Sequence, residues 1–160
     1  MTPEQAVDRL AAVLMNDPEL SASDIYDALA RAGVPDDVAD RAYKFTQIAW
    51  GRVFLGHLGL RFPPDYFCLN ARGDIVESGQ LDEEPYFVAA TGLAAEHRRS
   101  RGFARFAAMS ADVNAINDAL HAGSKPENLS IAPPALFVEA PTPEGIAKAR
   151  QEIGRRLRSR

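Results

Sequence analysis

The sequence predicts an α+β fold, a mostly helical single domain of about six helices with a small antiparallel β-hairpin or sheet. Two patterns support this. Apolar residues recur at helical spacing through most of the chain, whereas residues 66–81 form two short apolar runs around a glycine-containing turn. At 160 residues, with 46% apolar and 25% charged residues, the chain can bury a core of ordinary globular type.

We expect one globular domain over residues 1–160, because no linker is long enough to divide it. Its parts are a helical subassembly over 1–60, a mixed hairpin, helix and short-strand segment over 61–141, and a C-terminal helix with a basic tail over 142–160.

The first helix is predicted to start at Pro3, because Thr2 can cap it and proline suits its first position. Asn16-Asp17-Pro18 ends this helix. A second helix runs from a Ser23 cap to Gly33. The residues expected to face the core share helical spacing: Val7, Leu10, Leu14, Ile25 and Leu29.

The third predicted helix, over residues 36–60, is the most informative element because it is apolar or aromatic on two faces. A helix exposed to solvent needs only one such face. We therefore expect this helix to be central, with a core on one side and another layer, a pocket or a partner on the other. The two stripes are Val38, Ala42, Phe45 and Ala49, and Tyr43, Trp50, Phe54 and His57.

The second stripe is also a candidate binding surface. Tyr43, Trp50 and Phe54, with His57, would be good interface anchors if they were exposed. Packing in the core explains the same residues, and it is the interpretation that we favour.

Two strands are predicted at residues 66–70 and 75–81, joined by a turn that contains Gly73. A helix follows over residues 83–99. Residues 102–109 fit either a buried strand or a helix. The side chains expected to face inward from the 83–99 helix are Phe87, Ala90, Leu93 and Ala94.

The last third of the chain is predicted to hold a helix over 111–121, short strands at 129–131 and 136–138, and a final helix. Thr142 followed by Pro143 starts that helix in the same way as the N-terminal one.

Four polar residues fall on one side of the predicted 111–121 helix and its start, within about 60° of one another. One interpretation is a polar pocket wall, with a histidine as acid, base or ligand donor. The other, which we favour, is a half-buried boundary that hydrogen-bonds a neighbouring loop, since no partnered nucleophile or carboxylate pair accompanies it. The four residues are Ser110, Asn114, Asn117 and His121.

No catalytic, cofactor or metal site is predicted, because the phosphate-binding, dinucleotide, zinc and nucleophile-elbow motifs are all missing from the sequence. Three histidines and one cysteine lie far apart. Cys68 falls in an apolar run and is expected to be a buried, inert thiol. A single cysteine, an acidic start without a leader pattern and short apolar runs predict a cytoplasmic protein that does not cross a membrane.

The charge is unevenly distributed. Residues 1–40 hold nine acidic residues against two arginines, whereas residues 144–160 hold six basic residues against two acidic ones. The acidic segment fits a solvated helical face, with a basic C-terminal end that suits its helix dipole, and this is the interpretation that we favour; the alternative is a surface that attracts a protein partner, possibly a basic one. The acidic segment argues against DNA, because the one helix–turn–helix-like segment would offer phosphate a helix that begins Asp36-Asp37.

The favoured functional hypothesis is a small cytosolic protein-binding module, such as an inhibitor, immunity-like or adaptor protein, that acts by surface complementarity. An alternative is a small-molecule-binding protein or enzyme that uses the polar stripe around His121. A further alternative is a structural subunit whose aromatic stripe closes a homodimer.

Overall fold

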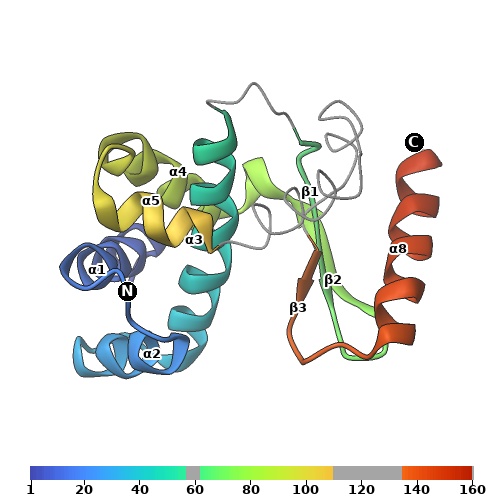
Figure 1. Cartoon of the computed structure of the whole chain (residues 1–160), viewed down its shortest axis with the longest axis horizontal. Helices are drawn as coiled ribbons and strands as arrows, with labels where there is room; N and C mark the ends of the chain where they lie inside the picture. Colours follow the sequence, from blue (N-terminus) through green and yellow to red (C-terminus); the bar gives the residue numbers. More distant parts are fainter. Residues whose placement is uncertain (57–61, 110–134, 160) are drawn as a thin grey trace.

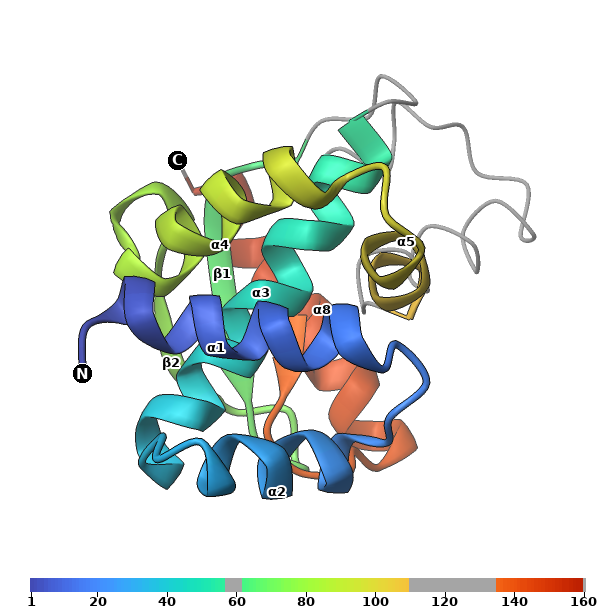
Figure 2. The same ribbon diagram turned by 90° about the vertical axis from the view of Figure 1, so that its left-hand side faces the viewer.

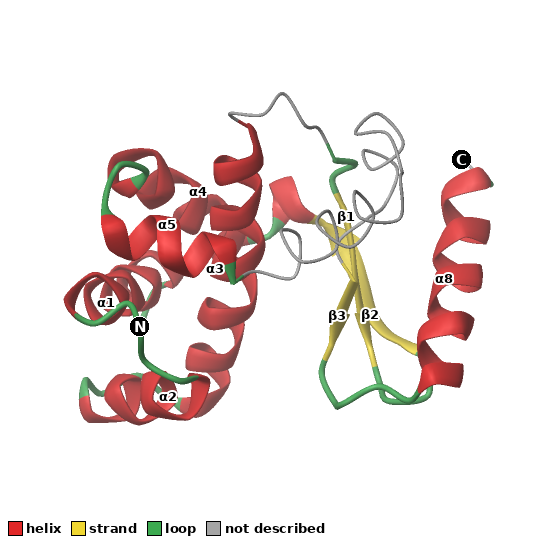
Figure 3. Ribbon diagram, in the orientation of Figure 1, coloured by secondary structure: helices red, strands yellow, loops and turns green. Residues whose placement is uncertain are grey.

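The structure, a computed structural model, describes residues 1–56, 62–109 and 135–159. In this part of the chain, six α-helices and a three-stranded sheet confirm the mostly helical α+β fold (Figures 1 and 3). Five helices form a bundle on one side of the sheet, and the sixth covers the other side (Figure 1). The bundle helices are α1 (Pro3–Asn16), α2 (Ala22–Arg31), α3 (Asp36–Gly56), α4 (Pro85–His97) and α5 (Arg101–Ala108).

The predicted start of α1 is confirmed. Thr2 and Gln5 form a reciprocal capping box, in which each side chain accepts a hydrogen bond from the backbone N–H of the other. For α2, the predicted cap is wrong by two residues, because Ser21 rather than Ser23 accepts from the N–H of Asp24 at 3.2 Å. The Ser21 hydroxyl also donates to the Asp24 carboxylate at 2.9 Å, and this second bond favours the earlier start.

Helix α3 is central, as predicted, but its two stripes do not face opposite sides, because Ala42 and Ala49 of the first stripe lie in the bundle core together with the second stripe. Trp50 is fully buried against α5, with its ring 5.2 Å from that of Phe103 and 5.7 Å from that of Phe106. On the other side, Phe45 packs edge-on against Tyr66 of the sheet, with ring centroids 5.1 Å apart. Helix α3 is therefore the element shared by the bundle core and the sheet core.

The sheet has the order β2-β1-β3, with β1 (Asp65–Leu69) in the centre. Strand β2 (Ile75–Gln80) pairs with it antiparallel, which confirms the predicted hairpin. Strand β3 (Ala135–Phe137) joins β1 in parallel, so the sheet is mixed. All five residues of β1 are buried, because helices cover both faces of the sheet.

Helix α8 (Pro143–Arg158) packs on the face of the sheet that points away from α3 (Figure 1). Ala149 and Ile153 on α8 contact Phe67 and Leu69 of β1 in a separate core on this face of the sheet. The predicted start is confirmed, because the Thr142 side chain accepts from the N–H at position 145 at 3.0 Å.

The remaining sequence predictions concern elements between residues 102 and 138. The segment 102–109, left open between strand and helix, lies within helix α5 over most of its length. The strand predicted at 136–138 is confirmed with a shift of one residue, as β3. The helix expected over 111–121 and the strand expected at 129–131 lie outside the described residues.

Candidate functional site

The predicted aromatic stripe lies within the helical bundle. Trp50 has no exposed surface, and Tyr43 and Phe54 are half-buried against the same core. The Tyr43 ring lies 5.3 Å from that of Tyr26 and 5.9 Å from that of Phe106. Core packing, the favoured interpretation, therefore describes Trp50, whereas Tyr43 and Phe54 keep part of their surface exposed.

The other predicted binding residues lie outside the described part of the chain. They are His57, Ser110, Asn114, Asn117 and His121.

A groove runs between α1 and α4, which lie side by side on the outer face of the bundle (Figure 2). Its volume is about 450 Å³. Helix α1 contributes polar and acidic side chains, and α4 contributes small and apolar residues. The residues that line the groove are Glu4, Gln5, Asp8, Ala89, Gly92 and Leu93.

The composition of α4 is unusual for a helix at the surface. It is apolar around nearly its whole circumference, a pattern typical of helices that are covered on all sides. In the described structure, only Ala90 and Ala94 are fully buried against the bundle. Val88, one turn before Gly92 on the same face, keeps 54% of its surface exposed. The apolar floor of the groove therefore continues along α4 onto open surface.

Gly92 lies in the middle of α4, where glycine weakens a helix. Its backbone does not require glycine, because its φ is not positive. The packing of the described chain does not require it either, since a Cβ built at Gly92 would meet no heavy atom within 4 Å. The missing side chain instead deepens the groove.

A cluster of charged groups joins α3 to the hairpin and to the start of α4. Arg41 donates to Glu84 at 2.6 Å and to Glu77 at 3.1 Å. Its guanidinium also lies 5.1 Å from the centre of the Phe45 ring. The Tyr66 hydroxyl completes the network by donating to Glu77 at 2.9 Å.

This network shifts the pKa values of its members. Burial, followed by the hydrogen bond to Glu77, raises the pKa of Tyr66 to about 12. For Glu77, burial alone would raise the pKa, but the bonds from Arg41 and Tyr66 lower it below its ordinary value. Because both carboxylates already bind Arg41, the cluster holds elements together and presents no free acid or base.

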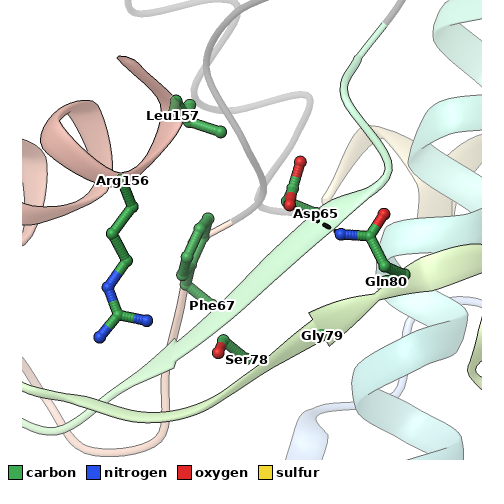
Figure 4. A pocket seen from close by; sticks show the side chains of 7 residues that line it. All are labelled: Asp65, Phe67, Ser78, Gly79, Gln80, Arg156 and Leu157. Carbon is green, nitrogen blue, oxygen red and sulfur yellow. Dashed lines mark hydrogen bonds between the residues drawn. The ribbon is translucent and has the colours of Figure 1, made fainter. Parts of the chain in front are cut away.

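A second cavity, of about 190 Å³, lies between the β1–β2 hairpin and the end of α8 (Figure 4). Phe67, Ser78 and Leu157 contribute to its wall. Asp65, which is 3% exposed, accepts a hydrogen bond from Gln80 at 2.9 Å. Arg156 also lines the cavity, and its guanidinium donates to Glu152 at 3.4 Å. The cavity is large enough for water or a few-atom polar molecule.

Within residues 1–56, 62–109 and 135–159, no three His, Cys, Asp or Glu side chains are arranged to hold a metal ion. None of the helices described there is both long enough and apolar enough to cross a membrane. Cys68 is buried as predicted, and burial raises the pKa of its thiol. That shift disfavours the reactive thiolate.

No known protein family matches this chain, and no curated protein or solved structure matches it either.

The α1–α4 groove is therefore the candidate site, and sequence reasoning found only part of it. The acidity of the N-terminal segment was predicted; Leu93 was expected to face inward, and it does pack against the bundle core, but it is only half-buried and also lines the groove. The overlooked signal was the continuous apolar character of residues 85–95, which exceeds what one buried face needs.

Proposed function

We propose that this chain is a protein-binding module whose α1–α4 groove holds a basic segment of a partner protein. The uncovered apolar face of α4 beside acidic α1 is the observation that carries this proposal. An apolar floor supplies binding energy by burial, and an acidic rim selects cationic side chains.

Charge complementarity supports a basic partner. Glu4 and Asp8 are exposed and lie one turn apart along α1, so two cationic side chains one turn apart can meet both. Further acidic residues on α2 and at the start of α3 extend the negative potential, which increases the rate of encounter with a cationic partner.

The apolar component gives specificity beyond charge. Residues Val88, Ala89 and Leu93 present small or branched apolar side chains with no polar group to satisfy. A purely cationic ligand would leave this apolar surface of α4 exposed to solvent. The matching segment is therefore basic and amphipathic, with apolar residues on the side that faces α4.

The test uses a synthetic 18-residue peptide of leucine, lysine and alanine in which leucines and lysines fall on opposite helical faces. Fluorescence anisotropy measures its Kd for the wild-type chain and for Glu4→Gln/Asp8→Asn. The control variant, Asp27→Asn/Asp37→Asn, removes the same charge from exposed positions on α2 and α3.

We expect the groove variant to bind about tenfold more weakly than the control variant, because two rim contacts of roughly 0.5–1 kcal/mol each are lost. Equal weakening by both variants would mean that binding follows net charge alone. Failure of the wild-type chain to bind would contradict the proposal.

A further inference from the structure

We infer that the segment bound in the α1–α4 groove is an α-helix that crosses α4 with its backbone close to Gly92. This inference rests on the proposed function and specifies the conformation of the partner. It also gives Gly92 a role in recognition.

The chemistry of the groove walls favours a helix over an extended strand. Both walls are helices: the α4 wall is mid-helix, where backbone groups bond within α4, and on α1 the N–H groups of Gln5 and Ala6 in the first turn bond to Thr2. An extended peptide would find no sheet edge to pair with here and would carry unsatisfied backbone groups onto an apolar floor. A helix satisfies its own backbone and offers only side chains.

Gly92 is the position at which a bound helix can lie closest to α4. Packed helices ordinarily lie 8–10 Å apart, and small residues at the crossing allow the shorter distances. The free space at the Cβ position of Gly92 admits an incoming side chain or backbone that any larger residue would displace. The flanking apolar surface runs from Val88 to Leu93, roughly 7–8 Å along the axis of α4.

The length of this apolar surface limits how many side chains of the bound helix can contact it. About one and a half turns of the apolar face of α4 can contact two apolar side chains of the bound helix, spaced at i and i+3 or i+4. Lysine or arginine residues on the flank of the same helix meet Glu4 and Asp8, which line the opposite wall. The partner is thus a short amphipathic helix with a pair of apolar residues one turn apart and a basic edge.

The test compares three variants with two peptides by fluorescence anisotropy. The first peptide is the leucine–lysine–alanine helix used above. The second has the same length and charge but carries two central prolines, which prevent a continuous helix. The variants are Gly92→Ala, Gly92→Leu and, as a control, Ala104→Leu, which adds a leucine at an exposed position on α5.

We expect the helical peptide to bind the wild-type chain at least tenfold more tightly than the proline peptide. Gly92→Leu is expected to weaken that binding about tenfold or more, with Gly92→Ala intermediate and Ala104→Leu unchanged. Circular dichroism checks that each variant remains folded, as expected because the Gly92 substitutions raise helix propensity and alanine to leucine changes it little.

The outcomes separate this inference from the proposed function. Equal binding of the two peptides, or full tolerance of Gly92→Leu with Glu4 and Asp8 still required, would overturn the helix while leaving the acidic groove as the binding site. Absence of binding by either peptide would overturn both.

Discussion

Gly73 and Gly145 face each other so closely that neither position has room for a side chain. A Cβ at Gly73 would lie 2.1 Å from the carbonyl oxygen of Gly145, and one at Gly145 would lie 2.2 Å from that of Ala71. The hairpin turn and the start of α8 therefore touch backbone to backbone. A hydrogen bond from the Thr142 N–H to Ala71 at 3.2 Å and an ion pair between Lys148 and Asp74 join the same two segments.

Gly73→Ala is expected to destabilise the chain by about 3 kcal/mol or more, because it adds a clash to the strain of a positive φ of 80°. Gly33→Ala is the matched control. Gly33 has a similar φ of 81°, but a Cβ there meets only a side-chain nitrogen of Arg9 at 3.8 Å, so its expected cost is about 1–2 kcal/mol. Urea denaturation measures both, and equal losses would argue against the close contact.

Glu84→Ala should cost about 2–3 kcal/mol, since it removes a carboxylate that is 9% exposed and leaves Arg41 short of one partner. The same change at Glu152, whose ion-pair partners Arg155 and Arg156 are 65% and 44% exposed, is expected to alter the free energy of unfolding by less than about 0.5 kcal/mol. Chemical denaturation of the two variants side by side checks the difference. Similar effects would show that the Arg41 cluster contributes little.

Trp50→Ala is expected to destabilise by about 3–5 kcal/mol, the usual cost of truncating a fully buried large aromatic residue. Thermal and urea unfolding measure this loss. A loss below about 1 kcal/mol would mean that Trp50 does not fill the core between α3 and α5.

The raised pKa of Tyr66, about 12 in the folded chain, predicts a loss of stability at high pH. The neutral phenol is favoured in the folded state. Its contribution is therefore complete below the ordinary tyrosine value near 10 and disappears as pH rises toward 12. Unfolding curves between pH 8 and pH 12 for wild type and Tyr66→Phe measure this contribution. The stability of the variant should fall less steeply across the window, and parallel curves would contradict the network.

Gly92→Ala is expected to stabilise the isolated chain by about 0.5–1 kcal/mol, because alanine is the better helix former and its Cβ has free space. Together with the weaker peptide binding expected above, this would be a trade of stability for function. Denaturation of the variant without peptide provides the measurement, and a destabilised variant would show that Gly92 has a packing role in the bundle.

The local elements of this fold could be predicted because their signals lie close together in the sequence. Thr2-Pro3 and Thr142-Pro143 start helices as expected, and the two stripes of α3 predicted its central position. The mistaken cap at Ser23 arose because two serines stand within reach of the same helix, and only the bond between Ser21 and Asp24 distinguishes them.

Long-range relationships were not predictable in this way. Arg41 binds Glu84, which lies 43 positions further along the chain. The sequence alone does not indicate this pair, because charged residues on predicted helices are ordinarily expected to be exposed to solvent. The parallel pairing of β3 with β1 likewise depends on a connection that local patterns do not specify. The groove could not be predicted either, because it depends on which face of α4 the bundle leaves uncovered. That face is set by the packing of α1 and α3 and not by α4 itself.

The most direct test of the central claim is hydrogen–deuterium exchange of the chain with and without the leucine–lysine–alanine peptide at saturating concentration. We predict that the bound peptide slows exchange in α1 around Glu4–Asp8 and in α4 around Val88–Leu93, with little change in α8. Protection confined to other elements, or spread evenly over the acidic surface, would contradict the α1–α4 groove as the binding site.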